Sequence, residues 1–311
     1  MSRIVISVDH GNSNIKTENH VFPASCVVSN HLPSLGADML VYHEKEYTLS
    51  DKRMPQLTDK TVDERYFILT LFAIAKELSD RDDYYSGATV DVVLLVGLPP
   101  LHCKEMSARF STYFKEHGKS VHFKFNNLLF SICITDVYVR PQAYAAVLTA
   151  SDQLKGCNTI NIVDVGGYTA DLLQLVDNKP NMSVCTSLYN GVNLLIQKIN
   201  ELVRAKGKQD IPHNVIEGVL LKNETVLTDC SDERVTLIQD QAEQFTMELL
   251  HKIQQFGLDL SENTAVFIGG GSLLLRDYIE ASGMVSRPVF VDDVHANAKG
   301  YSLIHSRIGR K

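Results

Sequence analysis

The feature that most constrains this chain is a pair of similar turns, each directly after a buried, strand-like run of residues. The first turn begins at Asp9 and has the sequence DHGNSNIK over residues 9–16. The second begins at Asp164 and has the sequence DVGGYTAD over residues 164–171. Each pattern predicts a strand, an Asp-x-Gly turn and a second strand. Because the second turn begins 155 residues after the first, we expect two similar half-molecules.

The first turn has the chemistry of a phosphate-binding loop. Gly11 permits a backbone turn that a side chain would block, so that backbone amides can face phosphate oxygens. Lys16 supplies a positive charge for a β- or γ-phosphate. Asp9 would repel phosphate, but it can hold the water shell of Mg²⁺, an ion that uses few carboxylates. The neighbouring side chains add neutral hydrogen-bond donors: Asn12, Ser13 and Asn14.

The second turn repeats this chemistry in the other half of the chain. Its carboxylate is Asp164, and its predicted phosphate contacts are Gly166, Gly167 and Thr169. Asp171 adds a carboxylate that could bind a metal ion through water or orient a nucleophile. One such turn alone is typical of an ordinary hairpin. The two together favour one nucleotide that both half-molecules contact.

A third turn, here called the glycine turn, has the sequence GGGS at residues 269–272, follows a buried strand-like run and opens a helical pattern. Glycines there allow the backbone to approach a ligand closely, and a helix N-terminus favours phosphate. The turn does not match GxGxxG, so the dinucleotide-binding fingerprint is not met. A flexible turn is the alternative, but beside the two Asp-x-Gly turns we expect this turn to contact the nucleotide.

The order of the predicted elements indicates an α/β or α+β fold in two related halves. Strands, a helix, a strand, a helix and further strands fill the first half, and the pattern then restarts near Thr159. In the first half, Pro141 at a favourable first-turn position predicts a helix that runs through residue 148. In the second half, the apolar spacing predicts one long amphipathic helix over residues 233–256.

Composition argues against several classes of function. The net charge of −7 argues against direct, sequence-independent DNA binding, which needs a basic face. The six cysteines form no CxxC pair and have no zinc spacing, so buried, reduced thiols in a cytosolic protein are the simplest account. No signal-peptide pattern and no membrane-spanning run is found. We therefore expect a cytoplasmic protein that binds neither nucleic acid directly nor a membrane.

Five segments, taken in order, resemble the actin, Hsp70 and hexokinase superfamily. They are the first turn, the segment RPQAYAA at residues 140–146, the second turn, the glycine turn and the segment NAKGY at residues 297–301. Within that superfamily, DHGNSNIK and the strand ending VGLPP at residues 96–100 are similar to bacterial actin-like plasmid-segregation proteins of the ParM/StbA type. The segment FAIAKEL at residues 72–78 is also similar to theirs.

This resemblance implies an actin-like, ribonuclease H-like fold of two domains with a nucleotide in the cleft between them. The first domain would comprise residues 1–153, with 292–311 returning to it, and the second residues 154–291. Asp9 and Asp164 would hold Mg²⁺ through water. The phosphates would be held by the two turns, through Gly11, Asn12, Ser13, Asn14, Lys16, Gly166, Gly167 and Thr169. Gly269, Gly270 and Ser272 would flank the adenosine.

Gln142 falls where the superfamily places the residue that orients the attacking water. The plasmid proteins often have glutamate there, whereas actin resembles this chain. Glutamine cannot act as a general base, but it can position a water molecule for attack on phosphorus. With Asp164 and Asp171, Gln142 completes the predicted catalytic set. We expect slow hydrolysis that is stimulated by assembly.

The implied function is an ATPase that polymerises into filaments and segregates plasmid DNA, with hydrolysis destabilising the filament. The resemblance implies ATP or GTP with Mg²⁺ as cofactors. The implied partners are further copies of the chain and a small DNA-binding adaptor on a centromere-like site. The alternative is a small-molecule kinase of the same superfold, because fold does not fix function. An Hsp70-like regulatory domain is disfavoured because no substrate-binding segment is found.

Overall fold

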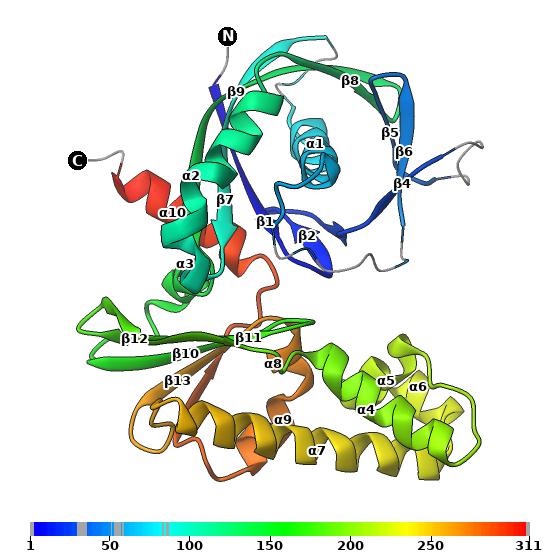
Figure 1. Ribbon diagram of the computed structural model, residues 1–311, viewed down its shortest axis with the longest axis vertical. Helices are drawn as coiled ribbons and strands as arrows, with labels where there is room; N and C mark the ends of the chain where they lie inside the picture. The colour runs from blue at the N-terminus through cyan, green and yellow to red at the C-terminus, as the bar shows by residue number, and fades with distance from the viewer. Residues whose placement is uncertain are drawn as a thin grey trace. The chain divides into compact units, whose positions relative to one another are not determined.

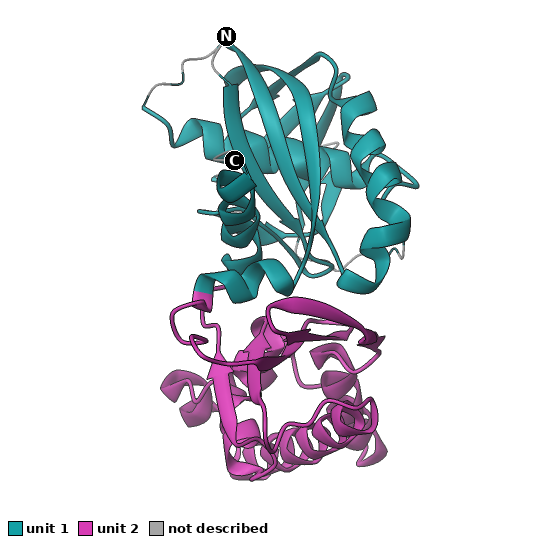
Figure 2. Ribbon diagram, turned by 90° about the vertical axis from the view of Figure 1, so that its left-hand side faces the viewer, with its two compact units in different colours: residues 1–149, 295–311 teal, residues 150–294 magenta. Residues whose placement is uncertain are grey.

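The computed structural model describes residues 3–29, 36–50, 52, 57, 59–82, 84 and 87–308. The chain forms two compact units, which Figure 2 shows in different colours. Unit 1 comprises residues 1–149 and 295–311, and unit 2 comprises residues 150–294. These limits differ by three or four residues from the domain boundaries expected from the sequence.

Unit 1 contains a nine-stranded sheet in the order β3-β2-β1-β7-β9-β8-β5-β6-β4. Its helices include α1 (Arg65–Ser79), α2 (Pro100–His117), α3 (Tyr144–Val147) and α10 (Ala296–Ile308), and a 3-10 helix covers Leu148–Ala150. The strands are β1 (Arg3–His10), β2 (Asn14–Lys16), β3 (Val21–Pro23), β4 (Cys26–Val28), β5 (Met39–Tyr42), β6 (Lys45–Leu49), β7 (Thr89–Leu98), β8 (Val121–Phe125) and β9 (Leu128–Pro141).

The sheet of unit 1 curls around helix α1. The strands at its two ends, β3 and β4, are separated in sequence by only Ala24 and Ser25, so the ends of the sheet must come together. Figure 1 shows α1 surrounded by strands. A helix enclosed in this way is apolar on every side, and residues 66–75 of α1 are all buried. The helix therefore lies within the hydrophobic core of the unit, together with side chains from the surrounding strands and from α2.

Unit 2 contains a five-stranded sheet in the order β12-β11-β10-β13-β14. Its strands are β10 (Thr159–Val165), β11 (Ala170–Val176), β12 (Lys179–Leu188), β13 (Thr264–Ile268) and β14 (Arg287–Phe290). Its helices are α4 (Val192–Ala205), α5 (His213–Leu220), α6 (Glu224–Asp229), α7 (Asp232–Gln255), α8 (Gly270–Leu274) and α9 (Arg276–Ala281). The long helix predicted over residues 233–256 is confirmed, because α7 buries its apolar face in the core.

The two units share one strand topology. In unit 1, β1 pairs antiparallel with β2 and parallel with β7, and β7 pairs parallel with β9. In unit 2, β10 pairs antiparallel with β11 and parallel with β13, and β13 pairs parallel with β14. The predicted turns occupy the same place in both sheets, between the first and second strands. The prediction of two related halves is therefore confirmed.

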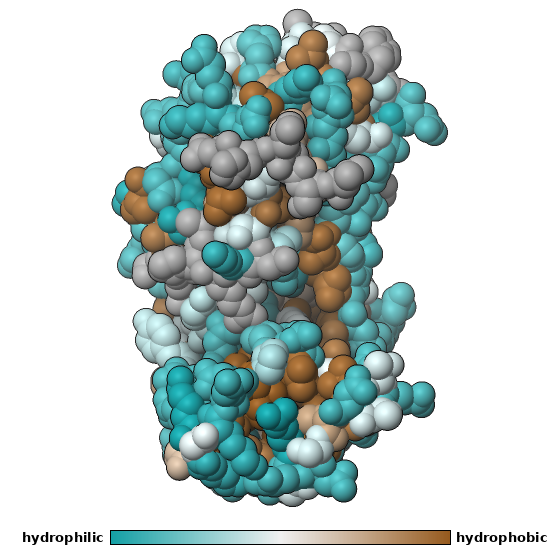
Figure 3. All heavy atoms as spheres, turned by 90° about the vertical axis from the view of Figure 1, so that its right-hand side faces the viewer, coloured by the Kyte–Doolittle hydropathy of each residue, from teal (hydrophilic) through white to brown (hydrophobic). Residues whose placement is uncertain are grey.

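Hydrophilic side chains predominate on the face shown in Figure 3, with smaller hydrophobic areas between them. No helix among the described residues is both long enough and apolar enough to cross a membrane.

Candidate functional site

The first turn places a buried carboxylate at the end of a central strand. Asp9 is the penultimate residue of β1, lies opposite Lys16 of β2 and is 3 % exposed. The turn closes tightly, because a Cβ atom on Gly11 would lie 2.5 Å from the Asn14 carbonyl oxygen. Any residue other than glycine would open the turn. The sequence pattern therefore folds as predicted at this point.

Three neutral groups of unit 1 donate hydrogen bonds to the Asp9 carboxylate. Gln142 Nε2 lies 2.6 Å from Oδ1, Asn297 Nδ2 lies 3.4 Å from Oδ2, and the Tyr301 hydroxyl lies 3.4 Å from Oδ1. Within the part of the chain that the structure describes, Asp9 forms no ion pair. A buried carboxylate is costly without a cation. The site therefore fits a cation such as Mg²⁺ that a ligand would bring.

The Asp9 carboxylate also determines how the Gln142 amide is oriented. An ionised carboxylate only accepts hydrogen bonds, so the amide must turn its NH₂ group towards Asp9. The Oε1 atom of Gln142 then faces away from Asp9 and can accept a hydrogen bond from a water molecule. This is the orientation that a water-positioning glutamine needs.

The backbone around Gln142 differs from the prediction. The helix expected to start at Pro141 begins only at Tyr144, because Pro141 still belongs to β9. Between them, Ala143 adopts φ 57° and ψ −56°, and the Tyr144 amide donates to the Gln142 carbonyl at 2.5 Å. This is a γ-turn with positive φ, which is rare and costs about 1–3 kcal/mol for a residue other than glycine. The strained turn lifts Gln142 out of helical geometry.

Gly97 makes room for this cluster. A Cβ atom on Gly97 would lie 1.9 Å from the Tyr301 hydroxyl oxygen and 3.0 Å from Gln142 Cγ. A side chain at this position of the VGLPP strand would clash with these two residues, so only glycine fits there. It lets the Tyr301 ring and the Gln142 side chain meet beside Asp9.

His10, the middle residue of the Asp-x-Gly turn, points into the core of unit 1. Its ring stacks on Phe114 with 5.2 Å between ring centroids, and its Nε2 atom lies 2.7 Å from the Thr70 hydroxyl. Thr70 donates its own hydrogen to the Tyr66 carbonyl, so Nε2 must carry the proton. The Nδ1 atom is buried and has no hydrogen-bond partner among the described residues. Burial, and after it the charge of Lys60, lowers the pKa of His10 well below that of an ordinary imidazole.

The buried His10 predicts a pH dependence of stability. The unfolded chain takes up a proton near pH 6.5, whereas folded His10 stays neutral, so the free energy of unfolding falls as the pH drops below that value. The slope from this one group reaches about 1.4 kcal/mol per pH unit. A His10→Phe variant, unfolded by denaturant between pH 7.5 and 5.5, is expected to lose less stability than the wild type. A His122→Gln variant, altered at an exposed histidine, serves as the control, and an equally steep loss in His10→Phe would contradict the prediction.

The other predicted residues of the first turn lie at or near the surface. The Asn14 side chain is exposed, while Asn12, Ser13 and Lys16 are half-buried. The Tyr66 hydroxyl lies 3.5 Å from Asn12 Oδ1. Their contacts with phosphate stay predictions.

The second turn brings two carboxylates together in unit 2. Asp164 of β10 and Asp171 of β11 are direct cross-strand partners, and the turn between them is closed by a hydrogen bond from the Gly166 amide to the Thr169 carbonyl at 2.8 Å. Like charges at opposite positions repel, so a cation would stabilise this pair. The arrangement fits the predicted metal role of Asp164 and the predicted auxiliary role of Asp171.

Residues 190–193, which sequence reasoning missed, pack on the second turn. The amides of Val192 and Asn193, at the start of α4, donate to the carbonyls of Gly166 and Gly167 at 3.1 and 2.8 Å. The Asn190-Gly191 pair is a turn signal that could have indicated this junction. Helix α4 therefore supports the second turn from its N-terminus.

The glycine turn lies against the second turn, so both turns of unit 2 can contact the same ligand. Gly269 has φ 86° and ψ 160°, a conformation that only glycine adopts readily. A Cβ atom on Gly269 would lie 2.5 Å from Asp164 Oδ1. Gly270 is exposed, whereas Ser272 is fully buried and its hydroxyl donates to the Ile268 carbonyl at 2.5 Å. The Ser272 hydroxyl thus closes the start of α8.

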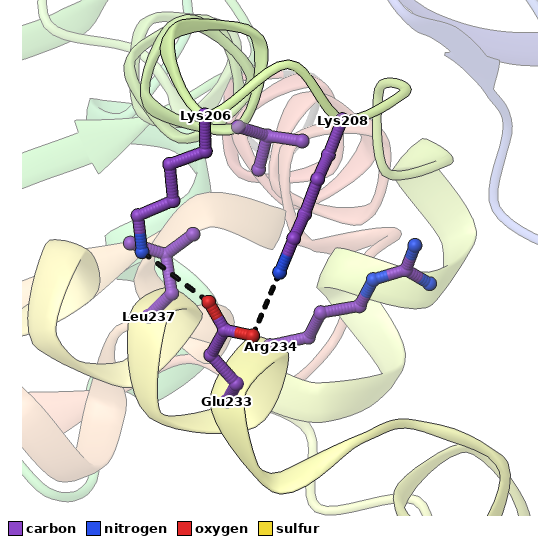
Figure 4. A pocket seen from close by; sticks show the side chains of 6 residues that line it. Lys206, Lys208, Glu233, Arg234 and Leu237 are labelled. Carbon is purple, nitrogen blue, oxygen red and sulfur yellow. Dashed lines mark hydrogen bonds and ion pairs between the residues drawn. The ribbon is translucent and has the colours of Figure 1, made fainter.

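A shallow pocket of unit 2 lies between the end of α4 and the start of α7 (Figure 4). The Glu233 carboxylate forms ion pairs there with the Lys208 ammonium group at 2.7 Å and with that of Lys206 at 3.5 Å. These two lysines, Lys208 first, lower the pKa of the Glu233 carboxyl. None of the site residues predicted from the sequence lines this pocket.

Comparisons with known proteins agree with this geometry. The family described as archaeal actin homologue MreB-like, C-terminal, matches residues 162–281, which contain both the second turn and the glycine turn. No curated protein sequence matches the chain.

Solved structures match the chain over almost its whole length. The archaeal actin homologue Ta0583 has a TM-score of 0.77 at 16 % identity, covering 98 % of this chain and 99 % of that one. A 15-stranded ParM filament from Clostridium botulinum gives 0.73 at 17 %, covering 99 % and 100 %. Bacillus thuringiensis ParM with ATP gives 0.68 at 12 %, covering 100 % of both chains. The prediction of an actin-like fold of the ParM type is confirmed.

Proposed function

We propose that this chain, whose fold is actin-like, is a nucleoside triphosphatase that polymerises when it binds ATP or GTP with Mg²⁺. The observation that carries the proposal is the 2.6 Å hydrogen bond from the Gln142 amide to the Asp9 carboxylate. It puts a water-orienting amide beside a buried carboxylate suited to the water shell of Mg²⁺. The ParM structures with similar folds, one a filament and one with ATP, support the same function.

In this proposal, the two turns and the glycine turn bind the nucleotide, and Asp9 and Asp164 hold the metal ion through water. Mg²⁺, when bound, would neutralise charge on the β- and γ-phosphates. Gln142 Oε1 accepts a hydrogen bond from the attacking water and so directs its lone pair at the γ-phosphorus. The water oxygen bonds to phosphorus as the bond to the β-phosphate oxygen breaks, the nucleoside diphosphate leaves with that bond's electron pair, and the proton that the water loses passes to a phosphate oxygen. Because glutamine takes no proton, hydrolysis is slow until the geometry improves on assembly.

We further propose that the filament segregates plasmid DNA through a small DNA-binding adaptor protein. The net charge of −7 supports an indirect link, because a chain that held DNA by its phosphates would need a basic surface. The cytoplasm is the compartment that this role requires.

The direct test adds nucleotide to the purified full chain and measures sedimentation and light scattering. We expect pelleting with Mg-ATP or Mg-GTP, and none with the diphosphate or with EDTA in excess. Release of inorganic phosphate is expected to follow assembly. No pelleting over a wide protein concentration range, together with phosphate transfer to a small acceptor, would instead identify a kinase.

A Gln142→Ala variant is expected to assemble normally but to hydrolyse its nucleotide about 10²-fold more slowly, because the attacking water is no longer aligned. After nucleotide is added, filaments of the variant should therefore persist longer than filaments of the wild type. Turbidity decay and phosphate release, followed in one sample, measure both effects. Gln244→Ala, which removes an exposed glutamine side chain of α7, is the matched control. A wild-type rate in Gln142→Ala would remove Gln142 from the mechanism.

A further inference from the structure

We propose that Asn297 is a positioning residue for hydrolysis, which holds Gln142 in place through the backbone of Ala143. The inference rests on the proposed nucleoside triphosphatase function and assigns a role to a residue outside the predicted site. Asn297 is the second residue of α10 and lies close after Val294, where the chain leaves unit 2.

The Asn297 side chain bridges two groups of the site. Its Oδ1 atom accepts a hydrogen bond from the Ala143 amide at 2.9 Å, and its Nδ2 atom donates to Asp9 Oδ2 at 3.4 Å. The chemistry of the partners determines this orientation, because a backbone N–H only donates and a carboxylate only accepts. No other uncharged side chain of this size offers an acceptor and a donor in that arrangement.

The hydrogen bond from the Ala143 amide to Asn297 matters because the backbone of Ala143 is strained. Its φ of 57° is unfavourable for alanine, so the γ-turn persists only where neighbouring contacts enforce it. The Asn297 bond satisfies the amide at the centre of that turn. On the N-terminal side of the turn, the backbone amide of Gln142 donates to the Leu98 carbonyl at 2.9 Å. Without Asn297, Ala143 can relax to negative φ, and the peptide rotation would carry the Gln142 side chain away from Asp9.

The geometry therefore links the start of α10 to the water-orienting amide by one side chain. Because the link acts on Gln142, its loss should lower the rate of hydrolysis and leave nucleotide affinity almost unchanged. A shift of about 1 Å in a catalytic group can cost about 10²-fold in rate.

A double-mutant cycle tests this link. Single-turnover phosphate release and the affinity for a fluorescent nucleotide are measured for the wild type, Asn297→Ala, Gln142→Ala and the double variant. Asn297→Ala is expected to lower the hydrolysis rate about 10²-fold. In the Gln142→Ala background the same change should cost less than about twofold, because residues that act as a unit are not additive. Equal losses in both backgrounds would overturn the proposal.

A rescue variant separates positioning from general destabilisation. Glycine adopts positive φ easily, so Ala143→Gly should keep the turn without the help of Asn297. The Ala143→Gly/Asn297→Ala variant is therefore expected to regain part of the hydrolysis rate. Asn200→Ala is the matched control, because Asn200 also bridges backbone groups, the amide and carbonyl of Ile211, but in unit 2. It should lower the melting temperature and leave hydrolysis unchanged.

The outcomes distinguish the proposed function of the chain from the role of Asn297. If the wild type hydrolyses no nucleotide, the proposed function and this inference both fail. If the wild type hydrolyses and Asn297→Ala matches it, only the inference fails. If neither Asn297→Ala nor its rescue variant folds, Asn297 is a structural residue and the inference is likewise overturned.

Discussion

Asp9→Asn is expected to lower Mg²⁺-dependent hydrolysis about 10³-fold while the chain stays folded. The change keeps the shape of the side chain but removes the charge that would hold the water shell of the metal. Loss of an outer metal contact typically costs 10–100-fold in affinity or activity. Asparagine also has only one oxygen, so it no longer forces the Gln142 amide into its water-accepting orientation, a defect worth a further factor of about 10². The two losses overlap, because both act on the same phosphate.

Stability separates this loss of function from unfolding. The Asp9 carboxylate is buried and its hydrogen-bond donors are neutral. Removing an uncompensated buried charge relieves a desolvation cost, so Asp9→Asn should melt at or above the wild-type temperature without nucleotide. Adding Mg-nucleotide should then raise the melting temperature of the wild type and barely change that of the variant.

The measurement is phosphate release against Mg²⁺ concentration, with thermal melts of the same samples. Asp136→Asn is the matched control, because that carboxylate lies on β9 in an exposed ion pair with Arg3. Exposed pairs contribute little, so the control should behave as the wild type does. If Asp9→Asn hydrolysed with an unchanged Mg²⁺ dependence, the assignment of the first turn to the metal site would be wrong.

The sequence predicted the parts of this fold that depend on local pattern. The two turns were found because each combines an Asp-x-Gly signal with flanking apolar runs, and both fold as strand, turn and strand. The curl of the unit 1 sheet around α1 has no such signal. It follows from which strands pair, and the pairing of β5 with β8 joins segments far apart in the chain.

The candidate site shows the same division between local and tertiary causes. Pro141 favours a helix start locally, but β9 continues through Pro141 and helix α3 begins only after the γ-turn at Ala143. An alanine gives no sign of positive φ, because the conformation is imposed by Asn297, 154 residues away. The aromatic side chains around His10 come from helices α1 and α2, so the sequence of the first turn does not reveal its surroundings. Only the assembled fold places these groups together.

Gly269→Ala is expected to destabilise the chain by about 2–5 kcal/mol, from a strained backbone and a clash in a packed region. The clash falls on the site itself, because the new Cβ atom would lie 2.5 Å from Asp164 Oδ1 and 2.6 Å from the Val165 carbonyl oxygen. Asp164 would have to move from its place opposite Asp171. Nucleotide affinity should therefore fall even at temperatures where the variant is fully folded.

The next residue supplies a matched control for this prediction. Gly270 is exposed and begins helix α8, and a Cβ atom added to it would meet no other atom within 4 Å. Gly270→Ala should therefore leave stability unchanged or raise it by up to about 1 kcal/mol, because alanine is the better helix former. Denaturant unfolding and nucleotide titration of both variants measure the contrast. Equal losses of stability in the two variants would mean that neither strain nor a clash makes glycine necessary at position 269.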